Sequence, residues 1–236
     1  MIPPPGPLLF CWRRQRRAAK VPPGPLRDYL TRKIPDPATD CRETPFLAVD
    51  LETTGLNPAE DQILSIGWVA MDGLTIRLDT AGQCWVRPTR AIPEASAVIH
   101  QITDDQAARG GTLGDALEQL LSVLGGRVML AHHAAVELGF LDRACQSQYG
   151  FGCMIPTVDT LRLAREEMER RQEAVRSGGL RLNALRQRYN LPRYKGHDAL
   201  NDALAAAELF AAQVSHRAHD GPLPLHRVLH RPGPLW

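Results

Sequence analysis

The stretch from Phe46 to Ala70 constrains this chain most, because two apolar runs enclose a pair of acids and a turn. The first run ends in Asp50-x-Glu52 and then breaks at residues 53–55. Side chains along a strand alternate between its two faces, so Asp50 and Glu52 are predicted to point to the same side. Two carboxylates this close repel each other unless a cation neutralises them, and oxygen ligands suit a hard cation such as Mg²⁺ or Mn²⁺. The alternative is a solvated strand face, which the apolar run before Asp50 disfavours.

Length and cysteine content limit the class of protein. The 236 residues allow one domain with a substantial core plus appendages. No run approaches the roughly 18 consecutive apolar residues of a membrane span, so no membrane segment is predicted. The 5 cysteines form no C-x-x-C pair. Their odd number favours reduced thiols over a disulfide framework or a zinc site, which predicts a cytoplasmic protein.

Residues 1–44 are rich in proline and carry most of the basic character. They contain nine Lys or Arg against four Asp or Glu, whereas the remainder contains nineteen against twenty-two. Proline disfavours a long helix, so the pattern predicts an extended arm with one short helix near Leu26 to Arg32. The charges follow the apolar residues 8–10, the reverse of a secretory signal. An arm that packs on the domain or touches nucleic acid, a partly ordered tail and a transit peptide all stay open.

The rest of the chain predicts a mixed sheet. A second strand over 63–69 and a third over 74–87 are joined by the hairpin signal Asp72-Gly73, which indicates an antiparallel meander. Periodicity then predicts a helix over 112–124 and a short buried strand over 128–131. Further helices are predicted over 135–149, 160–176, 180–189 and 199–217. This order predicts an α/β protein with a mixed β-sheet flanked by helices, a domain over 45–217 and an irregular tail over 218–236.

A third acid, Glu137, follows the buried strand. It lies in the first turn of the predicted helix, at the edge of an apolar face that includes Val136 and Phe140. The helix dipole favours an acid at this position, and that explains Glu137 without any function.

A fourth acid, Asp202, comes near the start of the last helix. Asp198 is predicted to be the N-cap of that helix, which places Asp202 one turn in. His197 lies in the lead-in beside Gly196, where a histidine near pH 7 can take a proton from water.

Three segments, in this order, resemble the DnaQ-like, DEDDh family of 3′ to 5′ exonucleases, which includes the proofreading domain of the bacterial DNA polymerase III epsilon subunit. They are Asp50-x-Glu52-Thr53-Thr54-Gly55-Leu56, then His132-x-Ala134 with an acid at 137 and Phe140-Leu141, then His197-x-x-x-x-Asp202. Supporting pieces are Ile92-Pro93-Glu94-Ala95 leading to Thr103-Asp104, and Val158-Asp159-Thr160-Leu161. The likeness extends from about Phe46 to Phe210. It rests on the order and spacing of these segments taken together.

The resemblance implies a ribonuclease-H-like fold and a hydrolase that removes nucleoside 5′-monophosphates from the 3′ end of single-stranded DNA or RNA. Two divalent ions, Mg²⁺ or Mn²⁺, would be held by four acids: Asp50, Glu52, Glu137 and Asp202. His197 would be the general base. The implied substrate-binding residues are Thr53, Thr54, Gly55, Leu56 and His132, with Leu56 against the last base.

The chain departs from the family pattern around Glu137. The family usually has aspartate there, asparagine at His133 and an aromatic at Val136. Glutamate keeps the charge and adds one methylene, so we expect activity with an altered metal preference. The alternative is a nucleic-acid-binding module that keeps the fold but does not cut. An HD phosphohydrolase, suggested by His132-His133 and His197-Asp198, is disfavoured because that fold is all-helical.

Several questions stay open at this point. The four histidines of the tail lack the spacing of a helical metal site, which favours a solvated tail over a metal cluster. They are His216, His219, His226 and His230. No clamp-binding peptide is evident, so a freestanding nuclease is predicted, with a polymerase or clamp partner open. The choice between DNA and RNA depends on the shape of the pocket around the 2′-hydroxyl.

Overall fold

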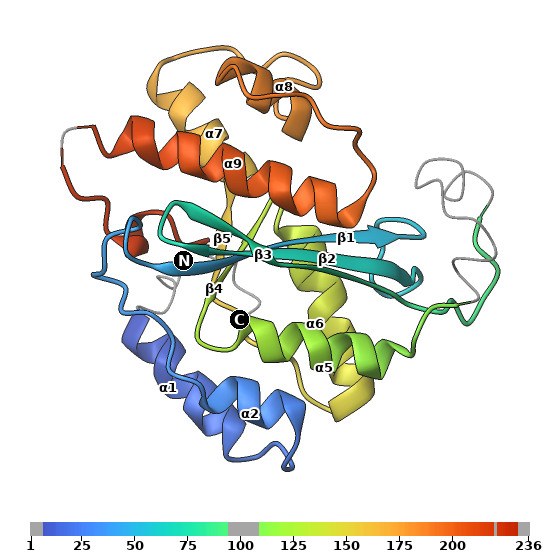
Figure 1. The fold of residues 1–236 in the computed structure, drawn as a ribbon. Coiled ribbons are helices and arrows are strands. Elements are labelled where there is room, and N and C mark those ends of the chain that lie inside the picture. Colours follow the sequence, from blue (N-terminus) through green and yellow to red (C-terminus); the bar gives the residue numbers. More distant parts are fainter. Residues whose placement is uncertain (1–6, 94–108, 220, 231–236) are drawn as a thin grey trace.

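Five strands of the described chain form one mixed sheet at the centre of the molecule (Figure 1). The structure is a computed structural model that describes residues 7–93, 109–219 and 221–230. The strand order is β3-β2-β1-β4-β5. The strands are β1 (Pro45–Thr53), β2 (Ile63–Asp72), β3 (Thr75–Trp85), β4 (Val128–Ala131) and β5 (Thr157–Asp159). The predicted mixed sheet is confirmed, although β5 was not predicted as a strand.

The pairing of the strands follows from their sequence. β1 to β3 form the predicted antiparallel meander, and Gly73 in the hairpin between β2 and β3 has a φ of 60°, which glycine adopts without steric cost. β4 and β5 continue the sheet in parallel. β1 lies between β2 and β4 and is buried over most of its length, which explains its continuous apolar run.

Helices cover both faces of the sheet. On one face α9 (Ala199–Arg217) packs on β1 and β2, with α7 (Thr160–Arg170) and α8 (Leu182–Arg188) beside it (Figure 1). On the other face lie α5 (Leu113–Leu124) and α6 (Ala135–Tyr149). α5 begins at a capping box between Thr112 and Asp115. The predicted helices are confirmed, except that α7 ends at Arg170 rather than at residue 176.

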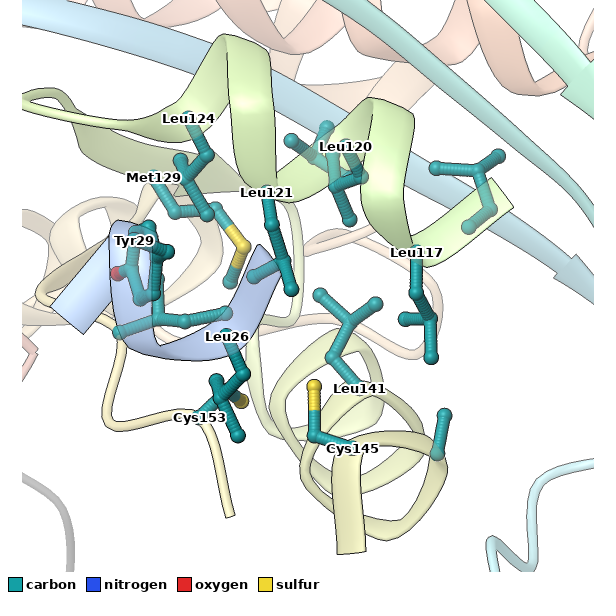
Figure 2. Packing of buried hydrophobic residues seen from close by; sticks show 14 of the residues in the cluster. Leu26, Tyr29, Leu117, Leu120, Leu121, Leu124, Met129, Leu141, Cys145 and Cys153 are labelled. Atoms are coloured by element: carbon teal, nitrogen blue, oxygen red, sulfur yellow. The ribbon is translucent and has the colours of Figure 1, made fainter. Parts of the chain in front are cut away.

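The basic leader is part of the fold, and the prediction of an extended arm was wrong. It forms α1 (Pro7–Ala18) and α2 (Pro25–Thr31), of which only the second was predicted. Pro25 lies at the start of α2, where the missing N–H costs nothing, so it begins that helix instead of preventing it. Pro7 is the first residue of α1 that the structure describes. Figure 2 shows Leu26 and Tyr29 of α2 packed among side chains of α5 and α6.

The last described residues also pack on the domain. Leu223, Leu225 and Val228 are buried in the apolar cluster beneath α9. Apart from one 3₁₀ turn, η1 (Leu225–Arg227), the segment is irregular as predicted. The Glu94 to Asp104 part of the family resemblance lies outside the described residues. The division of the chain into arm, domain and tail stays a prediction.

No helix in the described ranges combines the length and the hydropathy needed to cross a bilayer. All five cysteines are free thiols.

Candidate metal centre

Three of the four predicted acids meet at one end of the sheet. Asp50 and Glu52 lie near the end of β1, and Asp202 lies in the first turn of α9. One carboxylate oxygen of each lies within 4.8 Å of the others. Among the residues that the structure describes, this is the only group of three or more His, Cys, Asp or Glu side chains so arranged. The tail histidines therefore form no such cluster within the described part of the chain.

A close contact between α9 and β2 positions Asp202. Gly67 of β2 pairs with Asp50 of β1 in the antiparallel register. A Cβ at Gly67 would lie only 2.2 Å from the carbonyl carbon of Ala199 and 2.3 Å from the amide nitrogen of Leu200. Glycine therefore lets the first turn of α9 rest on the sheet beside Asp50, and this contact carries Asp202 to the acids of β1.

The lead-in to α9 is tied to the same carboxylate. Asp198 caps the helix as predicted, accepting a hydrogen bond from the amide of Asn201 at 3.0 Å. The backbone N–H of His197 donates to Asp202 Oδ2 at 2.7 Å. His197 has a φ of 66°, and its side chain is exposed beside the three acids. The backbone is thus fixed by Asp202 while the imidazole is accessible to solvent.

Glu137 is buried near this group but is not one of the three acids within 4.8 Å. Its side chain lies in the first turn of α6 and is 4% exposed. Burial raises the pKa of Glu137 to about 8, with a further contribution from the charge of Asp159. Burial also raises the pKa of Asp50, and among the neighbouring charges that of Glu137 contributes most. The four acids therefore act on one another electrostatically.

The arrangement fits a divalent cation. Glu137 Oε2 is buried and has no hydrogen-bond partner among the described residues. Such an atom is costly to bury unless it coordinates a cation or carries a proton. Burial raises the pKa of Asp202 as well, and the charge of Glu52 adds to that shift. All of the donors are carboxylate oxygens, which Mg²⁺ and Mn²⁺ prefer.

The loop after β1 is organised by a residue that the sequence did not single out, Asp61. Its carboxylate accepts hydrogen bonds from Thr54 Oγ1 at 3.0 Å and from the amide of Asn57 at 2.8 Å. Gly55 packs directly on this carboxylate, since a Cβ there would lie 2.5 Å from Asp61 Oδ2. The loop presents Leu56 to solvent with 77% of its surface exposed. An apolar side chain held outward by a closed loop is suited to contact a ligand.

The hydroxyl of Thr53 is used inside the same loop, where it donates to the carbonyl of Gly55 at 2.6 Å. His132, the other predicted substrate-binding residue, is also engaged within the protein. Its Nε2 lies 3.0 Å from the carbonyl oxygen of Leu180, and its Nδ1 lies 2.8 Å from Thr160 Oγ1. Burial lowers the pKa of His132 to about 4, so the ring is neutral at pH 7. Contact of His132 with substrate stays a prediction.

A buried polar network that the sequence analysis missed supports the segment before His197. The guanidinium of Arg186 in α8 donates to Glu208 Oε2 of α9 at 2.6 Å and to the carbonyl of Pro192 at 2.8 Å. Tyr194 donates to Glu208 Oε1 at 2.7 Å. The only signal of this network in the sequence is that Arg186 and Glu208 lie in helices whose buried faces are otherwise apolar. This network anchors residues 192–194 and therefore the start of the His197 loop.

A family model described as an exonuclease matches residues 47–210. The epsilon subunit of DNA polymerase III from Treponema pallidum is 30% identical over 178 residues, which cover 73% of this chain and 78% of that protein. A PolC-type DNA polymerase III from Thermotoga maritima is 29% identical over 165 residues. That match covers 70% of this chain but only 11% of the polymerase.

Solved structures confirm the architecture. The nuclease domain of 3′hExo, described as a DEDDh family member bound to rAMP, superimposes with a TM-score of 0.63. The match covers 75% of this chain and 95% of that domain, at 17% sequence identity. At this identity the likeness shows a shared fold and not a shared substrate. The five-stranded sheet excludes the all-helical HD phosphohydrolase fold.

Proposed function

This chain belongs to the DnaQ-like, DEDDh family of 3′ to 5′ exonucleases, and from that premise we propose that it removes nucleoside 5′-monophosphates from the 3′ end of single-stranded nucleic acid. One observation carries the proposal. Ligand oxygens of Asp50, Glu52 and Asp202, from two different elements, lie within 4.8 Å of one another. Exposed Leu56 and His197 lie on loops that adjoin these acids.

In this proposal four acids hold two divalent ions. Asp50, Glu52 and Asp202 supply oxygens at the end of the sheet, and Glu137 supplies the buried carboxylate whose Oε2 has no partner among the described residues. Bound divalent ions supply positive charge that stabilises the attacking and leaving oxygens of phosphodiester hydrolysis. The family is one of divalent-metal enzymes, whereas the choice of Mg²⁺ or Mn²⁺ and the number of ions belong to the proposal.

His197 acts as the general base. Its exposed imidazole takes a proton from the attacking water, while its backbone stays fixed to Asp202 through the 2.7 Å hydrogen bond. Leu56 packs against the terminal base, and the loop from Thr53 to Gly55 lines the pocket for the last nucleotide. The rAMP bound to 3′hExo is a nucleoside monophosphate, which is the chemical class of this product. Association with a polymerase or clamp stays open, and a freestanding enzyme is our proposal.

The direct test uses 5′-labelled single-stranded DNA and RNA with Mg²⁺, Mn²⁺ or EDTA. We expect a ladder that shortens from the 3′ end, is absent in EDTA and is lost in Asp50→Ala. Glu137→Asp is the matched variant, since it keeps the charge and should retain cutting. Binding of the strand without any metal-dependent product would instead favour the non-cutting module, and an Asp50→Ala protein as active as wild type would refute the proposed site.

A further inference from the structure

The leader helix α1 presents a basic face with an exposed aromatic ring. Its sequence contains four arginines and no acid. Trp12 is 50% exposed, and the guanidinium of Arg16 lies over its ring at 4.6 Å from the centroid. Arg13 and Arg16 are also exposed, at a spacing that places them along one side of the helix, and exposed Lys20 follows in the turn after it. The face therefore combines cations with an aromatic surface.

This face is rigidly attached to the domain. Arg14, 4% exposed, points inward and donates to the carbonyls of Tyr29 at 2.6 Å and of Leu30 at 2.7 Å, which lie at the end of α2. Ala18 and Val21 are buried in the main apolar core. The fixed inner side of α1 thus holds its outer cations in place, so that a ligand would meet a preformed surface.

An open hollow of about 450 Å³ in the surface, named the cavity below, adjoins α1 where it meets the end of α6. Arg17 and Arg143 line it, together with polar side chains, glycine backbone and Phe151. Arg17 also donates to the carbonyl of Gly152 at 3.1 Å. The acid next to Arg143, Asp142, is engaged by the amide of Cys153 at 3.1 Å. The volume is within the range of small-ligand sites, about 300–1,000 Å³, and the lining suits a phosphate with an attached ring.

Helix α6 connects this cavity to the metal centre. Glu137 lies in the first turn of α6, and the cavity is lined by residues from Arg143 to the end of the same helix. With a rise of about 1.5 Å per residue, the cavity begins roughly 9 Å along the helix from Glu137 and extends to about 20 Å. A single strand whose 3′ end lies at the acids can therefore reach α1 within a few nucleotides.

We propose that α1 and the cavity between α1 and α6 form a second contact for single-stranded nucleic acid, upstream of the 3′ end that the metal centre holds. The inference rests on the proposed nuclease function. Arg16, Arg17 and Arg143 contact backbone phosphates. Trp12 stacks on a base, a contact that every base can make because each has a π-face. Charge complementarity selects this partner: the arginines match a polyanion, and the exposed indole matches its bases.

The test measures binding and cutting separately. Binding uses fluorescence anisotropy with a 5′-labelled strand of about 30 nucleotides, longer than the ~4–16 nucleotides of one binding module. It is measured in EDTA at several salt concentrations. Cutting uses a trinucleotide with Mn²⁺, which is too short to reach α1. The variants are Trp12→Ala and the pair Arg16→Ala with Arg17→Ala, all of which lie in α1. Arg170→Ala removes an exposed arginine of α7, on the other side of the sheet, and is the control (Figure 1).

We expect Trp12→Ala to weaken binding of the long strand by roughly 5- to 150-fold, the range for loss of one stacked base. The arginine pair should reduce the slope of log affinity against log salt by about 1.4, because each phosphate that an arginine no longer neutralises lowers this slope by about 0.7. All variants should cut the trinucleotide at the wild-type rate, and thermal melting should show that they are folded.

The proposal is overturned if both variants bind the long strand as wild type does, or if Arg170→Ala weakens binding equally. It is also overturned if polyglutamate binds at these residues and the nucleic acid does not, which would indicate an acidic protein as the partner. If the wild type fails to cut the trinucleotide, the proposed nuclease function is refuted. The proposed second contact is not, because binding of the long strand is measured in EDTA without metal.

Discussion

Replacement of Gly67 by alanine tests whether the contact between β2 and α9 positions the metal centre. The backbone of Gly67 does not have a positive φ, so alanine introduces no backbone strain. The new methyl, however, would meet the backbone of Ala199 and Leu200 at 2.2–2.3 Å. Backbone atoms cannot swing aside as a flexible side chain does. The first turn of α9 must therefore move away from β2, and Asp202 moves with it.

The size of the effect follows from that overlap. The start of α9 has to shift by roughly 1 Å, and a misplacement of this size costs about 100-fold in catalytic rate. Overpacking of this kind also lowers the free energy of unfolding by about 1–3 kcal/mol. We expect kcat for removal of the 3′ nucleotide to fall by about that factor and the Mn²⁺ concentration for half-maximal activity to rise.

The assay is steady-state release of nucleoside monophosphate across an Mn²⁺ titration, with thermal melting of each protein. Gly111→Ala is the matched control, because that glycine is exposed and its Cβ would lie no closer than 3.8 Å to any neighbour. It should behave as wild type. A Gly67→Ala protein with unchanged kcat and an unchanged Mn²⁺ requirement would show that the close approach of α9 does not set the site.

Three further predictions concern the surroundings of the site. Because the pKa of Glu137 is raised from 4.5 to about 8, the metal-free folded protein holds a proton that the unfolded chain has lost. Its free energy of unfolding should therefore fall as pH rises from 5 to 8, with up to about 1.4 kcal/mol per pH unit contributed by this carboxyl. Glu137→Gln should reduce this slope in urea unfolding, and the raised pKa values of Asp50 and Asp202 should account for the slope that is left. Asp61→Asn replaces an acceptor of two hydrogen bonds by a group with one acceptor oxygen, which loosens the loop that carries Leu56. We expect KM to rise by about 5-fold, the equivalent of ~1 kcal/mol, with kcat little changed, as measured with a trinucleotide. Tyr194→Phe removes the hydroxyl that donates to Glu208 before the His197 loop, and stopped-flow hydrolysis should show a lower kcat with metal affinity unchanged.

Each of these has a contradicting result. A pH slope that is as steep in Glu137→Gln as in the wild type would show that Glu137 does not contribute to it. An Asp61→Asn protein that loses kcat but keeps KM would place Asp61 with the reacting atoms rather than with the loop. An unchanged kcat in Tyr194→Phe would separate the buried network from His197.

The sheet could be predicted, and the candidate acids could be located, because their sequence signals are local. The apolar run before Asp50, the hairpin signal at Gly73 and the N-cap at Asp198 each describe a few neighbouring residues. The order of the motifs along the chain then indicated the exonuclease family. The sequence identified the four candidate acids but not the distances between them. Glu137 lies outside the group of three acids whose carboxylate oxygens lie within 4.8 Å of one another, and only the folded chain shows this.

What the sequence did not predict depends on contacts between distant residues. The proline content predicted an extended leader. Proline is tolerated at the first position of a helix and breaks a helix from inside it, and the sequence alone does not show which of these positions a proline will occupy. The role of Arg186 requires α8 to meet α9 at Glu208, which is 22 residues later in the chain, and no residue near Arg186 in the sequence predicts this contact. The same is true of Gly67, whose function is to leave space for a helix more than 130 residues later in the chain.

The most direct measurement of the central claim is anomalous diffraction from crystals of this protein grown with Mn²⁺. The account predicts manganese peaks among the carboxylates of Asp50, Glu52 and Asp202, with Glu137 turned toward them, and no such peaks in Asp50→Ala. Crystals that bind no manganese at the end of β1, or bind it only at other residues, would contradict the account.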